Sequence, residues 1–354
     1  MKNNILDIYA TITGIKYTPF LCRKLKIYNL SHFEQALTKD ATFLLKIDDE
    51  NTIAVSWWVS CKRTRTYPYV RVYDSLSFAG KKITIIPIIK DEGADGDRDF
   101  IQWDTISLMS LLGVYVIIGY YCKAEKNVSY SNKITNQRFD IFYLKEKVSQ
   151  LISYQSDALH WNLEQTDQIG LIGKKALECY EKIGNDLNVN LKSKQMAEKR
   201  INDIMQDRNS FMEISRTLAQ EAQSRESKTI QPKEKLRDLK GKITIKNYLG
   251  GIYYFTADEA EIKEKSICLI EGKHTKKKEL PSLNDIKDGL LKMILFTNLK
   301  DITVGNSNEI YNKIPILKLT TTAEHIHKSS ELLTKLKREA EYNGFKVSIN
   351  DTFL

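Results

Sequence analysis

Two acidic residues and a lysine within residues 258–273 have the types and spacing that metal-assisted phosphodiester chemistry requires. Asp258 is followed by a charged stretch and then by an apolar run that ends in Glu271-Gly272-Lys273. Carboxylates are ligands that Mg²⁺ prefers, and one or two of them hold it against a substrate phosphate. The ion polarises the phosphoryl oxygen and lowers the pKa of a bound water. A neighbouring lysine orients or helps to deprotonate that water and offsets charge on phosphorus.

Strand alternation predicts that these side chains meet. Successive side chains of a strand point to opposite faces, so Glu271 and Lys273 share one face of a strand over residues 266–273. With a turn over residues 262–266, Asp258 lies beside the Glu271 end of the paired strand. Glu259 and Glu261 are alternative first metal ligands, because they adjoin Asp258 in the sequence.

The elements around the motif are predicted from their apolar patterns. Ser282 with Asp285 three residues later resembles a capping box, which predicts a helix that runs to about Asn298. Before this helix we expect an antiparallel meander, and after it a strand and a last helix. The meander comprises residues 242–246, 250–257, 261–262 and 266–273, and the later elements are residues 314–319 and 323–342.

Asp258 and the Glu271-Gly272-Lys273 triplet resemble the PD-(D/E)xK nuclease motif, over residues 241–320, and the whole chain is similar to a type II restriction endonuclease. The resemblance implies a mixed sheet flanked by helices, Mg²⁺ at Asp258 and Glu271, and Lys273 near the attacking water. It also implies double-stranded DNA as the substrate. Ala257 stands where the motif carries a proline, so Glu259 and Glu261 remain rival ligands.

Composition favours a globular protein with a polyanionic partner. The chain has 354 residues, enough for about two domains, and its net charge of +9 favours a nucleic acid. The five cysteines are scattered and form no C-x-x-C pair, which favours a reducing compartment and disfavours a zinc ribbon. The N-terminus lacks the apolar core of a signal peptide, and the run over residues 106–121 is too short for a membrane span. We therefore expect a cytoplasmic protein without a membrane segment.

The predicted fold class is α/β (α+β), in three regions. Residues 1–145 form an N-terminal α/β domain, a candidate for DNA recognition, because the β-branched run over residues 82–89 reads as a buried strand. Residues 146–235 form a helical region with a linker. Residues 236–354 form the PD-(D/E)xK-like domain. Residues 173–175 lack the flanking residues of a phosphate-binding loop, so no nucleotide cofactor is indicated.

Basic residues outside the motif are candidates for DNA contact. Residues 62–73 interleave arginine with tyrosine, and arginine makes bidentate contacts to phosphates and guanine edges. An edge strand with a solvated face is the alternative for this segment. The loop after Lys273 is also basic. The DNA-contact candidates are Arg63, Arg65, Arg71, Lys276 and Lys277.

The acidic loop from Asp91 to Asp99 has two interpretations. Its alternating aspartates resemble a calcium-binding loop, but the twelfth positions from Asp91 and Asp95 are Gln102 and Ile106, where that loop needs a bidentate glutamate. A solvated loop with acids near a helix N-terminus is the other interpretation, and the one that we favour.

These observations predict a Mg²⁺-dependent, site-specific DNA endonuclease of the restriction type. A homodimer is expected, because two copies of one site cut both strands most simply. One alternative is a defence or repair nuclease that a partner or signal activates. A further alternative is a nucleic-acid-binding protein without catalytic activity, in which the Glu-x-Lys is structural.

Overall fold

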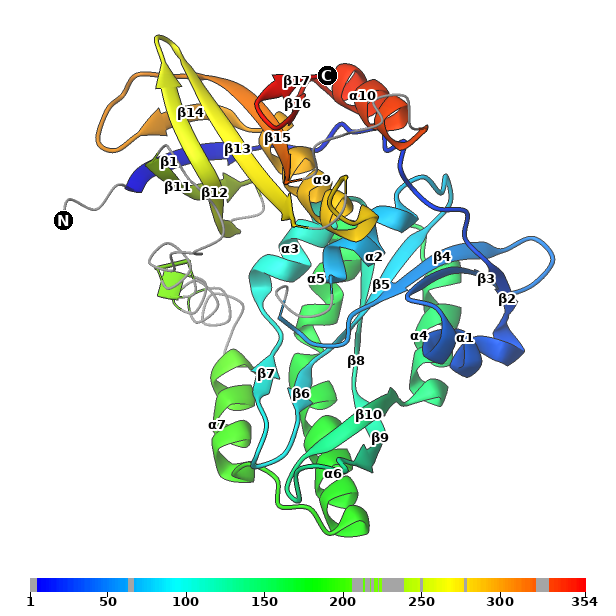
Figure 1. Cartoon of the computed structure of the whole chain (residues 1–354). Coiled ribbons are helices and arrows are strands. Elements are labelled where there is room, and N and C mark those ends of the chain that lie inside the picture. Colours follow the sequence, from blue (N-terminus) through cyan, green and yellow to red (C-terminus); the bar gives the residue numbers. More distant parts are fainter. Residues whose placement is uncertain are drawn as a thin grey trace. The chain divides into compact units, whose positions relative to one another are not determined.

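The computed structural model describes residues 5–62, 67–205, 239–248, 251–276, 279–322 and 331–354, together with residues 213, 217, 220, 221, 223 and 224. The chain belongs to the α+β class, with mixed sheets and helices, as predicted. It divides into two compact units (Figure 1). Unit 1 comprises residues 1–23 and 216–354, and unit 2 comprises residues 24–215.

Unit 1 is built on one mixed sheet with the strand order β14-β1-β11-β12-β13-β15-β16-β17. The strands β11, β12 and β13 form an antiparallel meander, whereas β15 and β16 run parallel to β13. The strand bounds are Ile5–Ile12 (β1), Leu239–Asn247 (β11), Ile252–Lys263 (β12), Ser266–Thr275 (β13), Lys300–Val304 (β14), Asn312–Thr321 (β15), Lys346–Ile349 (β16) and Thr352–Phe353 (β17).

The two faces of this sheet differ in the side chains that they carry. On one face, Ile8, Ile243 and Phe255 are cross-strand neighbours, and all three are buried. The helix α9 (Leu283–Thr297) packs on this same face, against β13 and β15, and α10 (Glu331–Asn343) packs against β16 (Figure 1). The face under α9 carries the candidate site.

Unit 2 contains a second mixed sheet, with the strand order β2-β3-β4-β5-β8. The strands β4, β5 and β8 run parallel and pair through buried β-branched residues, as expected for strands covered on both faces. The bounds of these strands are Ile27–Asn29 (β2), Thr42–Lys46 (β3), Thr52–Trp57 (β4), Lys82–Pro87 (β5) and Val114–Gly119 (β8). Unit 2 also contains two small antiparallel pairs. They are Ile89–Asp91 (β6) with Arg98–Phe100 (β7), and Tyr121–Lys126 (β9) with Ile134–Phe139 (β10).

Helices cover the sheet of unit 2, and α5 also closes its β8 edge. The Asn162 side chain of α5 accepts a hydrogen bond from the Val116 amide and donates one to the Val114 carbonyl, which satisfies edge groups of β8. The helix bounds are Leu30–His32 (η1), Phe33–Lys39 (α1), Pro68–Ser75 (α2), Trp103–Leu111 (α3), Ile141–Ser153 (α4), Ala158–Asp167 (α5), Ile169–Leu187 (α6) and Lys194–Met205 (α7).

The observed division differs from the three predicted regions, 1–145, 146–235 and 236–354. Residue 145 lies inside α4, so this boundary falls within unit 2. The N-terminal strand β1 pairs in parallel with β11, with Ile5 opposite Lys240. The first residues of the chain therefore complete the sheet of unit 1, and unit 2 is inserted between the two parts of unit 1.

Candidate active site

The hairpin of β12 and β13 brings the motif residues together. Its register pairs Glu259 with Ile270, and the turn contains Glu264 with a positive φ of 53°. Asp258 therefore lies beside the Glu271–Lys273 end of β13, and its Oδ2 accepts a hydrogen bond from the Gly272 amide at 2.8 Å. The predicted proximity of Asp258 to the Glu-x-Lys triplet is present in the structure.

Glu271 and Lys273 point to the same face of β13, as strand alternation requires. The Lys273 Nζ lies 2.9 Å from the Glu271 Oε1. Glu271 is only 2% exposed, so its charge depends on partners within the protein rather than on solvent.

Helix α9 supplies two more charged side chains to this cluster. Asp288 Oδ2 lies 2.8 Å from the Lys273 Nζ, and the Lys292 Nζ lies 2.7 Å from the Glu271 Oε2. Lys292 also donates to the Thr256 carbonyl oxygen of β12, at 3.2 Å. Asp288 and Lys292 are four residues apart and so project from one side of the helix.

Local sequence explains why α9 reaches the strands so closely. Its N-cap, Ser282, accepts a hydrogen bond from the Asp285 amide, which confirms the predicted start of the helix. Gly289 faces β13 and β15, where an added Cβ would lie 2.7 Å from the Leu317 Cδ1 and 3.3 Å from the Lys273 Cε. The absence of a side chain at Gly289 therefore lets Asp288 and Lys292 reach the site.

The acid–base states of the cluster follow from burial and from these contacts. Burial, with the negative charge of Glu271, raises the pKa of Asp258 to about 7. Burial also disfavours the Glu271 anion, but Lys292 and Lys273 outweigh it and hold the Glu271 pKa below its ordinary value. For Lys273, burial is outweighed by Glu271 and Asp288, so its pKa is raised and it stays protonated at neutral pH.

The donor set fits a hard divalent cation. Asp258 and Glu271 offer carboxylate oxygens on adjacent strands, and Mg²⁺ takes one or two carboxylates with water and phosphate as its other ligands. Ammonium groups already lie against both oxygens of Glu271, so the position attracts cations. Within the described residues, no three His, Cys, Asp or Glu side chains form a metal-binding group. Asp258 and Glu271 would thus hold the ion as a pair.

The rival ligands Glu259 and Glu261 point to the opposite face of β12. Glu259 is buried there, with its Oε1 3.6 Å from the Lys318 Nζ. Glu261 forms an ion pair with Lys263, at 2.8 Å. Asp258 accepts a hydrogen bond from the Gly272 amide of the triplet, whereas the register places Glu259 and Glu261 opposite Ile270 and Cys268.

The predicted DNA-contact residues lie in different settings. Arg71 belongs to α2, where its guanidinium stacks on Trp57 at 4.3 Å from the ring centroid and donates to the Trp57 carbonyl. Burial lowers the Arg71 pKa to about 10. Arg71 is therefore bound within unit 2, and residues 68–73 of its segment lie in a helix rather than in the alternative edge strand. Arg63, Arg65 and Lys277 lie outside the described residues, and Lys276 is exposed just after β13.

The acidic loop is a hairpin with buried ends and an exposed turn. It forms the β6–β7 pair, in which Asp91 is buried and accepts a hydrogen bond from the Arg98 Nε at 2.6 Å. Asp99 is buried as well, and it contacts the Lys62 Nζ and the Ser60 hydroxyl. Ion pairing stabilises these two carboxylates in the interior, whereas Asp95 and Asp97 are exposed, so the expectation of a solvated loop holds for the turn and not for its two ends.

Sequence reasoning missed Asp288 and Lys292. A signal was present, since Asp288 and Lys292 are opposite charges four residues apart on the helix. Periodicity alone does not tell which charged residues of a helix face a strand, because that depends on how the helix docks.

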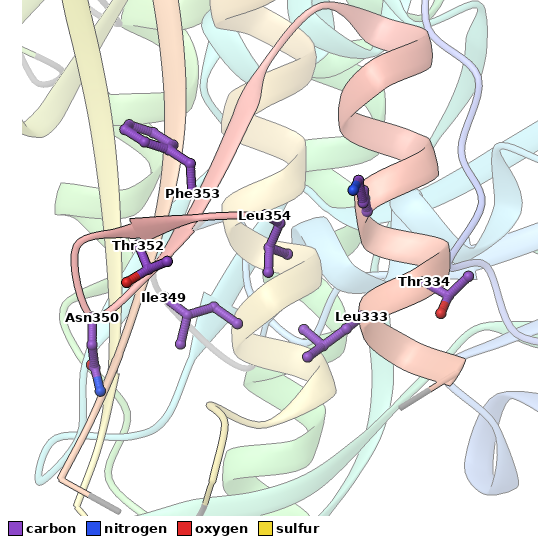
Figure 2. Close-up of a pocket in the computed structure, with 8 residues that line it drawn as sticks. Leu333, Thr334, Ile349, Asn350, Thr352, Phe353 and Leu354 are labelled. Atoms are coloured by element: carbon purple, nitrogen blue, oxygen red, sulfur yellow. The ribbon is translucent and has the colours of Figure 1, made fainter. Parts of the chain in front are cut away.

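A separate pocket of about 450 Å³ lies between α10 and the C-terminal strands of unit 1 (Figure 2). Its Ile349 pairs with Leu319, and Leu319 pairs with Lys273 across β15. The pocket therefore opens on the same sheet face as the candidate site, two strands away. Its lining is largely uncharged, with Leu333, Thr334, Ile349, Asn350, Thr352, Phe353 and Leu354 beside Lys337.

Comparisons with known proteins found no relative: no protein-family model, no curated protein and no solved structure matches the chain. Within the described ranges, none of the helices combines the length and the apolar character that a bilayer crossing requires. The geometry of the site is therefore the basis for assigning a function.

Proposed function

We propose that the protein is a Mg²⁺-dependent endonuclease of the restriction type that hydrolyses phosphodiester bonds in double-stranded DNA. The observation that carries the proposal is that Asp258 accepts a hydrogen bond from the middle of the triplet in which Glu271 and Lys273 form an ion pair. The antiparallel meander, the helix α9 and the parallel strand β15 give the β12–β13 hairpin the setting expected of a PD-(D/E)xK core.

In this proposal each side chain has a defined part. Asp258 and Glu271 hold the cation, which when bound polarises the phosphoryl oxygen and acidifies a water. Lys273 acts as a cationic hydrogen-bond donor rather than as a base, because Glu271 and Asp288 keep it protonated. It orients the attacking water and offsets the negative charge that develops on the phosphate oxygens.

A row of lysines on β11 supports a nucleic-acid partner. Lys240, Lys242 and Lys246 alternate along one face of β11. This face is opposite α9, because Gly241 and Ile243 of β11 lie on the buried side, where Gly241 approaches Ala260 of β12. Alternate residues of a strand lie roughly 7 Å apart, so the row offers repeated cations to a phosphate backbone that runs along this face.

Mutation of the motif in a cleavage assay tests the proposal. Purified protein is incubated with supercoiled plasmid DNA and Mg²⁺, and the products are separated on a gel. We expect wild-type protein to cut, and Glu271→Gln and Lys273→Ala each to lower the rate by at least about 100-fold. Glu261→Gln is the matched control, because Glu261 lies on the opposite face of the same hairpin. Normal cutting by both site variants overturns the proposal.

The assay also separates the alternatives. Closed ion pairs on both oxygens of Glu271 favour a second candidate, a nuclease that a partner or signal must activate. Cutting by wild-type protein only after addition of cell extract supports that candidate. Salt-dependent DNA binding without cutting under either condition indicates a binding protein. Cleavage of both DNA strands at one site, together with a protein mass in solution equal to two chains, supports a homodimer.

A further inference from the structure

The ammonium group of Lys292 lies where the two motif strands meet. It is 2.7 Å from the Glu271 Oε2 of β13 and 3.2 Å from the Thr256 carbonyl of β12. Thr256 precedes Asp258 by two residues on β12. Lys292 thus bridges the strands that carry Asp258 and Glu271, and it contacts oxygen atoms of both.

The two lysines of the site are held differently. Lys273 follows Glu271 on the same strand and contacts two carboxylates, those of Glu271 and Asp288. Lys292 comes from the helix, and its contacts include Glu271 of β13 and a carbonyl of β12. Lys292 is therefore the lysine that lies between the strands of Asp258 and Glu271, where a cation held by both carboxylates would bind.

We propose that Lys292 fills the cation position at Glu271 in the metal-free protein, and that Lys292 and a divalent cation exclude each other there. This inference rests on the proposed function, and it adds regulation to the same site. A dication and an ammonium at one buried carboxylate repel each other strongly, because little solvent separates them.

The consequence is a site that stays closed until metal arrives. Before binding, Lys292 neutralises Glu271 and keeps a buried carboxylate from standing unpaired. When metal binds, the flexible lysine side chain turns away from Glu271 on its four methylene groups. Its charge is then available at the rim of the site, where a phosphodiester carries negative charge.

Titration of the protein with Mg²⁺, without nucleic acid, tests this exclusion by calorimetry. Lys292→Met removes the ammonium and keeps the length of the side chain. We expect this variant to bind Mg²⁺ at least about tenfold more tightly than wild type, since one competing charge is gone. Lys313→Met is the matched control, because Lys313 is a half-buried lysine that donates to the Leu299 carbonyl at 2.6 Å. Its Mg²⁺ affinity should equal that of wild type.

Amine labelling of wild-type protein gives a second measurement that no folding defect can obscure. An acylating reagent is applied with and without Mg²⁺, and labelled lysines are quantified by mass spectrometry. We expect Mg²⁺ to increase the labelling of Lys292 several-fold and to leave Lys313 unchanged.

The outcomes separate this inference from the proposed function. If wild type binds Mg²⁺ but Lys292→Met binds it no more tightly, and Lys292 labelling does not rise, the exclusion is overturned and the nuclease proposal stands. If neither protein binds Mg²⁺, both the exclusion and the metal-dependent function are overturned.

Discussion

The carboxylate of Asp258 accepts a hydrogen bond from the backbone amide of Gly272, at 2.8 Å. The amide belongs to the middle residue of the Glu-x-Lys triplet, so one bond fixes the acid of β12 against the acid and the lysine of β13. Since a backbone donor makes this contact, it does not depend on which side chain occupies position 272.

Asp258 should make stability depend on pH. The pKa of Asp258 is about 7 in the folded chain, above the ordinary value of 3.8, so folding favours the protonated carboxyl. The contribution of Asp258 to stability is therefore complete below about pH 4 and is lost as the pH rises through 7. We expect the unfolding free energy of Asp258→Asn to match that of wild type at pH 4 and to exceed it at pH 8 by on the order of 4 kcal/mol.

Urea unfolding with a chelator present, at pH 4, 6 and 8, measures this difference. If the difference in unfolding free energy between wild type and Asp258→Asn stays constant across the three pH values, the raised pKa of Asp258 is contradicted.

Gly289 should be required for close docking of α9. An alanine there places its Cβ 2.7 Å from the Leu317 Cδ1, and overpacking of this kind costs about 1–3 kcal/mol, which offsets the gain of about 1 kcal/mol in helix propensity. We expect Gly289→Ala to lower both the cleavage rate and the melting temperature.

The second variant Leu317→Val makes room for that Cβ, so the double variant should recover part of the loss relative to the sum of the single variants. Gly14→Ala is the control, because its Cβ would meet nothing within 4 Å. Additive effects of Gly289→Ala and Leu317→Val show that the two positions do not collide.

The lysine row of β11 should contribute to DNA affinity through counterion release. Replacement of Lys240, Lys242 and Lys246 by alanine should weaken duplex binding and reduce the slope of log K against log salt by up to about 2.7. Fluorescence anisotropy with a chelator, at several salt concentrations, measures this slope.

A control that removes the same charge replaces Lys194, Lys263 and Lys335 by alanine. Each of these lysines pairs with a glutamate elsewhere on the protein. An equal loss of affinity in both triple variants assigns the effect to net charge and not to the β11 row.

Arg71 should stabilise unit 2 whether or not it contacts DNA. Arg71→Ala removes the stack on Trp57 and the hydrogen bond to its carbonyl, and we expect a loss of about 1–3 kcal/mol in unfolding free energy. Arg71→Lys should recover little, because an ammonium cannot reproduce the planar stack. Unaltered thermal unfolding of Arg71→Ala contradicts this structural role.

Local patterns in the sequence predict much of unit 1. Alternation places Glu271 and Lys273 on one face, and Ser282 marks the start of α9, because both signals depend only on neighbouring residues. The pattern also separates residues 250–257 from 261–262, whereas β12 is one continuous strand, since its charged end still pairs with β13.

Other features arise only when distant segments meet. The pairing of β1 with β11 joins Ile5 to Lys240, and no local signal specifies such a partner. Lys292 enters the site because α9 docks on β13, and Arg71 leaves the surface because α2 packs beside β4. Each of these outcomes is decided by tertiary packing, which periodicity within one element does not encode.

The insertion of unit 2 between the two parts of unit 1 sets an order of assembly during synthesis. β1 leaves the ribosome first but pairs with β11, which is translated only after all of residues 24–215. Lys292 follows later still. A growing chain can therefore complete unit 2 while the acidic site does not yet exist. A nascent chain that ends before Thr321 lacks part of the strand β15 that supports Asp258, Glu271, Lys273 and Lys292.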